Sequence, residues 1–108
     1  MQLNVALGAL CKNSLEAIGH DGRIEITVRR LGQTAEVRVS DDGPGIRPEH
    51  RRHLFDPFYS ARQAGRGLGF GLPKCWRIVT NHGGHVEVES TPGQGAVFTV
   101  TLPLRRLG

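Results

Sequence analysis

The sequence predicts an α/β (α+β) two-layer sandwich, in which helices cover one face of a mostly antiparallel mixed sheet. Two segments carry apolar residues at three- and four-residue spacing, which is typical of amphipathic helices. Four shorter segments alternate apolar and polar residues, and a glycine-containing turn lies between the members of each pair. Because every predicted strand is apolar on one side only, one layer of helices is sufficient to cover the sheet.

The first helix is expected over residues 2–18, and an Asp-Gly pair at 21–22 ends it. Its apolar residues form one stripe: Leu3, Leu7, Leu10, Cys11, Leu15 and Ile18. The opposite face carries Ala9, Lys12, Asn13 and Glu16. The oxygens of an asparagine and a glutamate at this spacing could ligate a hard cation such as magnesium, although a solvated helix face is the simpler interpretation.

A hairpin follows, with Ile24, Ile26 and Val28 in its first strand and a Gly-Gln turn at 32–33. In the second strand Ala35, Val37, Val39 and Asp41 share one face. Asp41 should therefore point toward the helices, and Asp42 away from them. A buried carboxylate needs a hydrogen-bond donor, which is either a protein group or the amine of a ligand. A tight turn capped by Asp41, with Gly43 and Gly45 beside it, is the alternative.

The second half of the chain repeats this organisation. Pro48 should begin a short helix that runs to about Leu54, since proline suits the first helical turn. Residues 56–70 show no period and predict a long loop. A second amphipathic helix is marked by Leu72, Cys75, Trp76 and Val79, and glycines at 83–84 end it. A second hairpin is marked by Val86, Val88, Phe98, Val100 and Leu102, with a Pro-Gly turn at 92–93.

Bulk composition narrows the function classes. With 108 residues, the chain is expected to form one domain. Its formal net charge is +4, but the basic residues are dispersed, which disfavours a nucleic-acid binder. Cys11 and Cys75 fall on apolar helix faces, as expected for reduced core thiols of a cytosolic protein. No apolar run of about 18 residues and no export signal is present in this stretch.

Glycines occupy every second position just before the second helix: Gly65, Gly67, Gly69 and Gly71. Free backbone N–H groups and a helix N-terminus suit a phosphate, although such a run alone is weak evidence. The run is neither a P-loop, which needs a Lys-Ser or Lys-Thr pair, nor a dinucleotide fingerprint, which directly follows a strand. His50 and His53 could bind a metal from the short helix, but a solvated basic face is the simpler interpretation.

Six motifs, in order, resemble the catalytic domain of sensor histidine kinases of the nitrogen-regulation and oxygen-sensing type, which has the Bergerat-type ATP-binding fold. They are Asn13 to Ala17 (N box), Asp41 to Ile46 (first glycine box), Leu54 to Arg62 (F box and start of the ATP lid), Gly67 to Leu72 (second glycine box), His82 to Gly84, and Thr91 to Gly95. The resemblance covers nearly the whole chain. It departs from the family at Ala9, where many relatives have a second asparagine.

The resemblance implies ATP and Mg²⁺ as cofactors. It assigns Asn13 to the metal and to catalysis, and makes Glu16 a candidate catalytic participant. It implies that Asp41 accepts a hydrogen bond from the adenine amine. The residues expected to bind the nucleotide are Asp41, Gly43, Gly45, Ile46, Phe58, Arg62, Gly67, Leu68, Gly69, Gly71 and Leu72.

The implied function is a cytoplasmic protein histidine kinase, whether or not the parent protein is anchored in a membrane. It would transfer the γ-phosphoryl group of ATP to a histidine on a separate dimerisation domain, with a response regulator downstream. Residues 1–108 are then an N-terminally truncated catalytic domain without its acceptor domain, and such a fragment is expected to self-associate. The alternatives are a degenerate, non-catalytic module for nucleotide binding or protein docking and, less favoured, an ATPase like DNA gyrase, which carries a water-activating glutamate where Ala9 stands.

Overall fold

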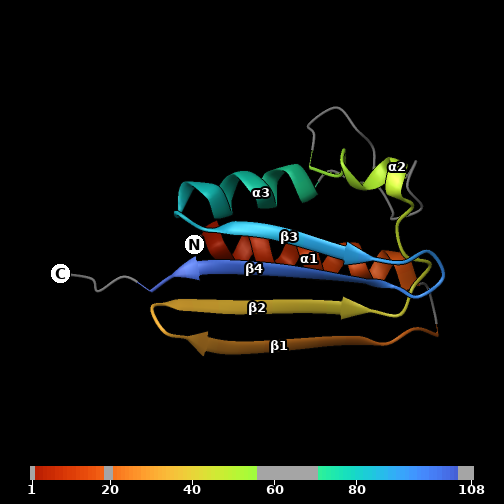
Figure 1. The fold of residues 1–108 in the computed structure, drawn as a ribbon, viewed down its shortest axis with the longest axis horizontal. Coiled ribbons are helices and arrows are strands. Elements are labelled where there is room, and N and C mark those ends of the chain that lie inside the picture. The colour runs from red at the N-terminus through yellow and green to blue at the C-terminus, as the bar shows by residue number, and fades with distance from the viewer. Residues whose placement is uncertain (1, 19–20, 56–70, 105–108) are drawn as a thin grey trace.

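The structure is a computed structural model, and it describes residues 2–18, 21–55 and 71–104. Its elements are α1 (Gln2–Ile18), β1 (Ile24–Leu31), β2 (Thr34–Asp41), α2 (Pro48–Arg51), α3 (Gly71–Asn81), β3 (His85–Ser90) and β4 (Ala96–Pro103). The strands form one sheet in the order β1-β2-β4-β3, and every pairing among them is antiparallel. Helices α1 and α3 pack against each other on one face of this sheet (Figure 1). The predicted two-layer sandwich is confirmed, and the described part of the sheet contains no parallel pair.

The core lies between the helices and the two central strands, β2 and β4. Along β4 the side chains of Phe98 and Val100 are fully buried, and Val39 of β2 pairs directly with Phe98. The helices contribute Ala6, Leu10, Leu72, Cys75 and Val79, all at 0% exposure. Burying a large apolar side chain contributes about 1.5–3 kcal/mol each, so these residues supply most of the stabilisation of the fold.

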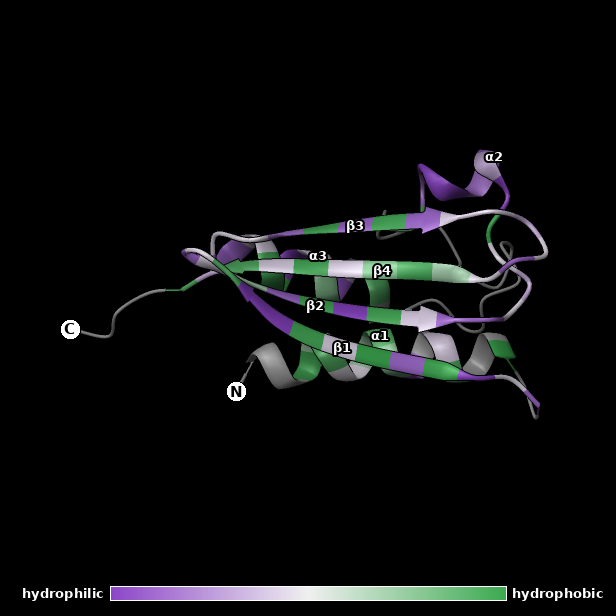
Figure 2. Cartoon of the chain, turned by 60° about the horizontal axis from the view of Figure 1, so that its bottom comes forward, coloured by the Kyte–Doolittle hydropathy of each residue, from purple (hydrophilic) through white to green (hydrophobic). Residues whose placement is uncertain are grey.

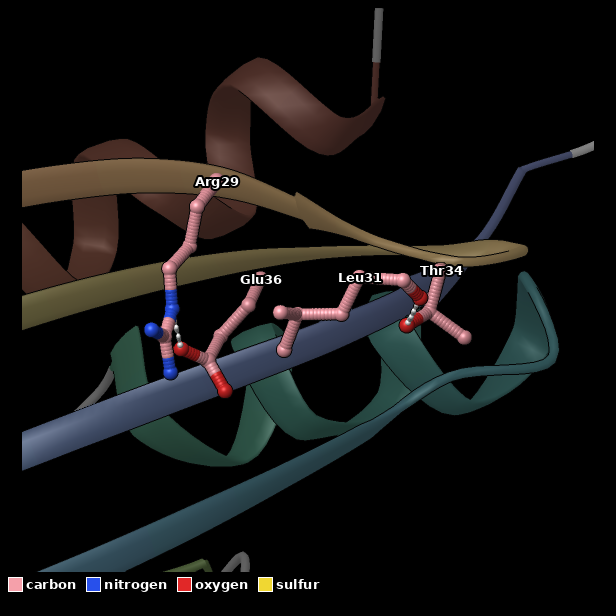
Figure 3. A network of polar contacts seen from close by, with 4 residues as sticks. All are labelled: Arg29, Leu31, Thr34 and Glu36. Carbon is pink, nitrogen blue, oxygen red and sulfur yellow. Dashed lines mark hydrogen bonds and ion pairs between the residues drawn. The ribbon is translucent and has the colours of Figure 1, made fainter.

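The first hairpin has the predicted turn, and its strands pair from Ile24 with Asp41 to Leu31 with Thr34. Alternating hydrophilic and hydrophobic residues along β1 are visible in Figure 2. On the face away from the helices, Arg29 Nε lies 3.0 Å from Glu36 Oε1, and Thr34 Oγ1 donates to the Leu31 carbonyl at 2.9 Å (Figure 3). The Arg29 side chain is 58% exposed and that of Glu36 is 16% exposed, and a pair that is open to solvent on one side contributes little, about 0.2–1 kcal/mol.

Burial of the first strand was wrongly expected. Ile26 and Val28 do lie on the helix side, because they pair with Val39 and Val37, but they are 53% and 69% exposed. The reason is the position of β1 at the edge of the sheet: α1 packs on β2 and α3 packs on β3. The alternating pattern identifies the face of a strand, but it does not show how far the helical layer extends.

Three helical positions also differ from expectation. Leu15 is 58% exposed and Trp76 is 45% exposed, whereas Ala9 packs against the core. In α1 the fully buried stripe runs through Ala6, Leu10 and Ser14, so its centre is rotated away from Leu15 toward Ala9. The predicted stripe was misplaced because it was drawn from apolar residues alone and therefore left out the buried Ser14.

The short helix and the last hairpin are as predicted, with one shortened boundary. Proline begins α2, but the helix ends at Arg51 and turns continue to residue 55, so that Leu54 enters the core at 1% exposure without being helical. Gly83, with φ of 80°, ends α3 in the left-handed conformation that glycine favours. Among the described helices, none has the length and apolar character needed to cross a membrane.

Candidate functional site

Asp41 is the last residue of β2 and points into the helix layer, as its strand parity predicts. Its exposure is 5%. Ser14 of α1 donates its hydroxyl to Asp41 Oδ2 at 3.0 Å, and the Gly43 N–H donates to Asp41 Oδ1 at 3.0 Å. Both sequence interpretations hold: the carboxylate caps the turn after β2, and it also reaches a helical residue across the two layers. Two donors offset much of the cost of burying this charge.

Ser14 is the site residue that sequence reasoning missed. Its exposure is 0%, although serine is usually found on protein surfaces. The signal was available, since Ser14 follows Leu10 by one helical turn and directly follows Asn13. Parity had already placed Asp41 on the helix side, so a buried hydroxyl on the facing helix was a natural donor.

The loop after Asp41 is fixed by a second contact network. Ile46, at 1% exposure, anchors the loop in the core, and its N–H donates to Ser90 Oγ at 2.7 Å. The Ser90 hydroxyl donates in turn to the Gly95 carbonyl at 2.7 Å. Ser90 thereby ties the loop that follows β2 to the turn that precedes β4, a role that sequence reasoning did not assign.

Glycines are required where these two segments touch. Gly45 has φ of 77°, and a Cβ atom there would lie 2.5 Å from the Thr91 carbonyl oxygen. At Gly95 a Cβ atom would lie 1.9 Å from the Asp41 carbonyl oxygen. The Gly93 N–H also donates to the Pro44 carbonyl at 2.7 Å. These contacts hold the backbone around Asp41 in a single arrangement.

Asp42 makes hydrogen bonds that are separate from those of Asp41. Its side chain is exposed, and Oδ1 accepts a hydrogen bond from the Arg23 N–H at 2.7 Å. The Asp42 N–H donates to the Arg23 carbonyl at 3.2 Å. Asp42 therefore ties the end of β2 to the residue before β1.

The remaining predicted site residues are only partly covered by the structure. Leu72 is fully buried in the first turn of α3, and Gly71 is the first residue of that helix. Asn13 and Glu16 lie within α1, one residue before and two residues after Ser14, and only their backbone is described. Phe58, Arg62, Gly67, Leu68 and Gly69 lie outside the described residues. The structure thus brings Ser14, Asp41 and the loop to Ile46 together, next to the helix that carries Asn13.

Two further observations concern the surroundings of this site. In the described part of the chain, no group of three or more His, Cys, Asp or Glu residues could hold a metal ion. A depression of about 280 Å³ borders the site, because Asp41, Ser90 and Gly95 are among its lining residues. It is also lined by Ser40, Glu89 and Val97, which pair in one row of the sheet adjacent to the row of Asp41, so that the side chains of this second row point away from the helices.

Comparisons with known proteins point to one family. A family model described as histidine kinase-, DNA gyrase B- and HSP90-like ATPase matches residues 1–106. Sporulation kinase C of Bacillus subtilis (strain 168) is 38% identical over 104 residues, which are 96% of this chain and 24% of that protein. Sensor histidine kinase ZraS of Klebsiella oxytoca is 38% identical over 104 residues, which are 95% of this chain and 22% of that protein. The chain thus spans about a quarter of the length of these relatives.

Solved structures show the same fold. The catalytic domain of histidine kinase ThkA superposes with a TM-score of 0.83 at 32% identity, over 95% of this chain and 67% of that domain. The mycobacterial sensor histidine kinase MprB gives a TM-score of 0.83 at 26% identity, over 98% of this chain and 72% of that one. The chain therefore belongs to the family of histidine kinase-, DNA gyrase B- and HSP90-like ATPases, and it has the fold of a histidine kinase catalytic domain.

Proposed function

We propose that this chain is the ATP-binding catalytic domain of a two-component sensor histidine kinase. It transfers the γ-phosphoryl group of ATP to a histidine on a separate dimerisation domain, in the cytoplasm and upstream of a response regulator. The observation that carries this proposal is Asp41, a buried carboxylate held by Ser14 and Gly43 at the end of β2. Sensor kinases among the relatives support it.

In this proposal the adenine amine donates to the carboxylate of Asp41. Gly43, Gly45 and Ile46 form the loop beside the base. The remaining nucleotide contacts are assigned to Phe58, Arg62, Gly67, Leu68, Gly69, Gly71 and Leu72. The glycines give backbone N–H groups to the phosphates at the start of α3, where the helix N-terminus favours negative charge.

Magnesium is assigned to Asn13, and Glu16 is assigned a part in catalysis. An amide oxygen and the phosphate oxygens are the ligands that Mg²⁺ prefers, and the ion would neutralise phosphate charge during transfer. Asn13 directly precedes Ser14 on α1, so the helix that orients Asp41 also carries the metal ligand. Phosphoryl transfer depends mainly on placement and electrostatics, which a shared rigid helix supplies.

The competing functions differ in what they require. A docking module that binds no nucleotide does not need a buried carboxylate, whereas Asp41 is held by two donors. ATP hydrolysis to free phosphate needs a group that activates water. Ala9, which packs against the core, stands where gyrase-like ATPases carry a glutamate for this purpose. Both observations favour transfer to a histidine.

Calorimetry with an ATP analogue and magnesium, followed by labelling, tests this proposal. Asp41→Asn should weaken ATP binding about 10- to 150-fold, because a charge-assisted hydrogen bond contributes roughly 1.5–3 kcal/mol. The chain alone should remain unlabelled by radioactive ATP, and it should label a cognate dimerisation fragment added in trans. ATP binding without labelling of that fragment would favour the docking module, and unchanged affinity in Asp41→Asn would exclude Asp41 from the site.

A further inference from the structure

We propose that Ser14 is a positioning residue that sets the preference of the site for adenine over guanine, by fixing the carboxylate of Asp41. The inference deepens the proposed function and rests on it, because it takes Asp41 to be the group that meets the purine. It adds a residue from a different layer of the fold, which the sequence interpretation had left out.

The contact between Ser14 and Asp41 is unusual for a helical serine. A serine inside a helix commonly donates back to the carbonyl one turn earlier. The Ser14 hydroxyl instead donates to Oδ2 of Asp41, 27 residues away, at 3.0 Å. Ser14 occupies a core position in the stripe of Ala6 and Leu10, where an apolar residue would bury more apolar surface. A polar side chain at this position is accounted for by its action on Asp41.

The direction of this hydrogen bond determines what the pair can offer a ligand. A carboxylate has only lone pairs, so the Ser14 hydroxyl must supply the hydrogen. Once that hydrogen is committed, Ser14 Oγ has only acceptor capacity left. The pair therefore presents lone pairs and no donor to a group that approaches it. The second oxygen, Oδ1, is oriented in the same way by the Gly43 N–H at 3.0 Å.

This polarity discriminates between the two purines. Adenine carries an amino group at position 6, which donates to an acceptor. Guanine carries a carbonyl oxygen at the same position. In a buried site this oxygen would face the lone pairs of Asp41 and Ser14, and no hydrogen bond could form between them. Without Ser14, the Asp41 side chain loses one of its two described anchors and can turn to a different orientation. We expect such freedom to reduce the preference for adenine as well as the affinity for ATP.

Three variants at Ser14 separate positioning from packing. Ser14→Ala removes the hydroxyl, Ser14→Cys keeps the shape but offers only a weak donor, and Ser14→Thr keeps the donor. The affinities for ATP and GTP are measured by calorimetry, and the thermal midpoint Tm is measured without nucleotide. Ser14→Ala and Ser14→Cys should lower the ratio of ATP to GTP affinity on the order of 10-fold, as expected for one lost buried hydrogen bond. Ser14→Thr should restore much of that ratio.

Ile78→Val is the matched control, because Ile78 is buried at 7% exposure in α3 and is not among the residues assigned to the site. It should lower Tm and leave the ATP to GTP ratio unchanged. If Ser14→Ala does not fold, Ser14→Cys and Ser14→Thr decide the question.

The outcomes distinguish this inference from the proposed function. If Asp41→Asn weakens ATP binding but Ser14→Ala and Ser14→Cys keep the wild-type ratio, the role of Ser14 is overturned and the nucleotide site stands. If Asp41→Asn also leaves ATP binding unchanged, the nucleotide site itself is wrong. A ratio that falls equally in Ile78→Val would reduce Ser14 to a packing residue.

Discussion

The choice of residue type is most restricted at the few core positions that hold polar side chains. Ser14 and Asp41 are both buried, and each satisfies the other across the boundary between helix and sheet. Strand parity predicted the direction of Asp41 correctly, because a period of two leaves only two choices. Ser14 was missed because helical periodicity is read from apolar residues, and a buried serine interrupts that pattern. Functional residues in a core are thus the ones that pattern analysis tends to omit.

Cys75 gives a prediction at the same scale. Burial raises the pKa of its thiol from 9.0 to about 12 in the folded chain. Between these values the unfolded chain loses the proton and the folded chain keeps it, so alkaline pH favours unfolding. The contribution of Cys75 to stability is therefore complete below pH 9 and declines by up to about 1.4 kcal/mol per pH unit above it. Urea unfolding from pH 8 to 11 measures this slope.

Cys75→Ala is the control for that measurement. It removes the titrating thiol while the other alkaline groups remain, so its stability should fall less steeply with pH than that of the wild type. Identical slopes would show that burial of Cys75 does not control alkaline stability. Absolute stabilities are not compared, since the smaller side chain also leaves a cavity.

At the scale of elements, the loop after β2 and the turn before β4 act as one unit. Ser90 accepts from the Ile46 N–H and donates to the Gly95 carbonyl, both at 2.7 Å. Ser90→Ala leaves two buried or half-buried backbone groups without this partner. We expect it to lower the free energy of unfolding by about 1–3 kcal/mol and to weaken ATP binding, because Asp41 begins this loop.

Thr80→Ala is a suitable comparison for Ser90→Ala. The Thr80 hydroxyl only bonds back to carbonyls of its own helix, Trp76 at 2.9 Å and Arg77 at 3.1 Å, far from Asp41 in the sequence. It should leave ATP affinity unchanged. An affinity that is also unchanged in Ser90→Ala would show that the loop is positioned without the serine.

The position of a strand in the sheet decides how much its apolar residues contribute to the free energy of unfolding. Val28 and Val100 lie in the same row of the sheet, connected through Val37, but they are 69% and 0% exposed. Val28→Thr should change the free energy of unfolding by no more than about 0.5 kcal/mol. Val100→Thr buries a hydroxyl in the core and should cost about 1–3 kcal/mol. Chemical denaturation of the two variants compares them directly, and equal losses would contradict an uncovered β1.

At the scale of the whole molecule, local sequence patterns predicted the two layers and the four strands, because each strand has one apolar face and each long helix has one apolar stripe. Sheet order did not follow, since β4 inserts between β2 and β3 and no local pattern encodes that neighbour. The geometry of the candidate site follows from the sequence where it depends on chain direction, as at Asp41, Gly43 and Gly45. The prediction was incomplete where the site depends on contacts between distant segments, as at Ser14 and Ser90.

The uncovered face of β1 has a consequence for the state of the molecule in solution. Ile26 and Val28 are more than half exposed on the helix side, and Leu15 of α1 is 58% exposed. Among the described strands, β1 pairs only with β2, so its outer edge offers unpaired backbone groups. Exposed edges and apolar patches of this kind recruit other chains. We therefore expect the isolated chain to self-associate as its concentration rises.

Sedimentation at increasing concentration measures this association, and Val28→Lys is the informative variant. A charge at the edge strand opposes pairing with a second chain, and Val28 is too exposed for lysine to disturb the core. Val28→Lys should shift the sedimentation profile toward the monomer without lowering Tm by more than a few degrees. Trp76→Lys places the same charge on α3, away from β1, and should leave association unchanged. A wild-type chain that stays monomeric at high concentration would show that the exposed face does not attract a second copy, and an equal shift in both variants would attribute the effect to net charge rather than to β1.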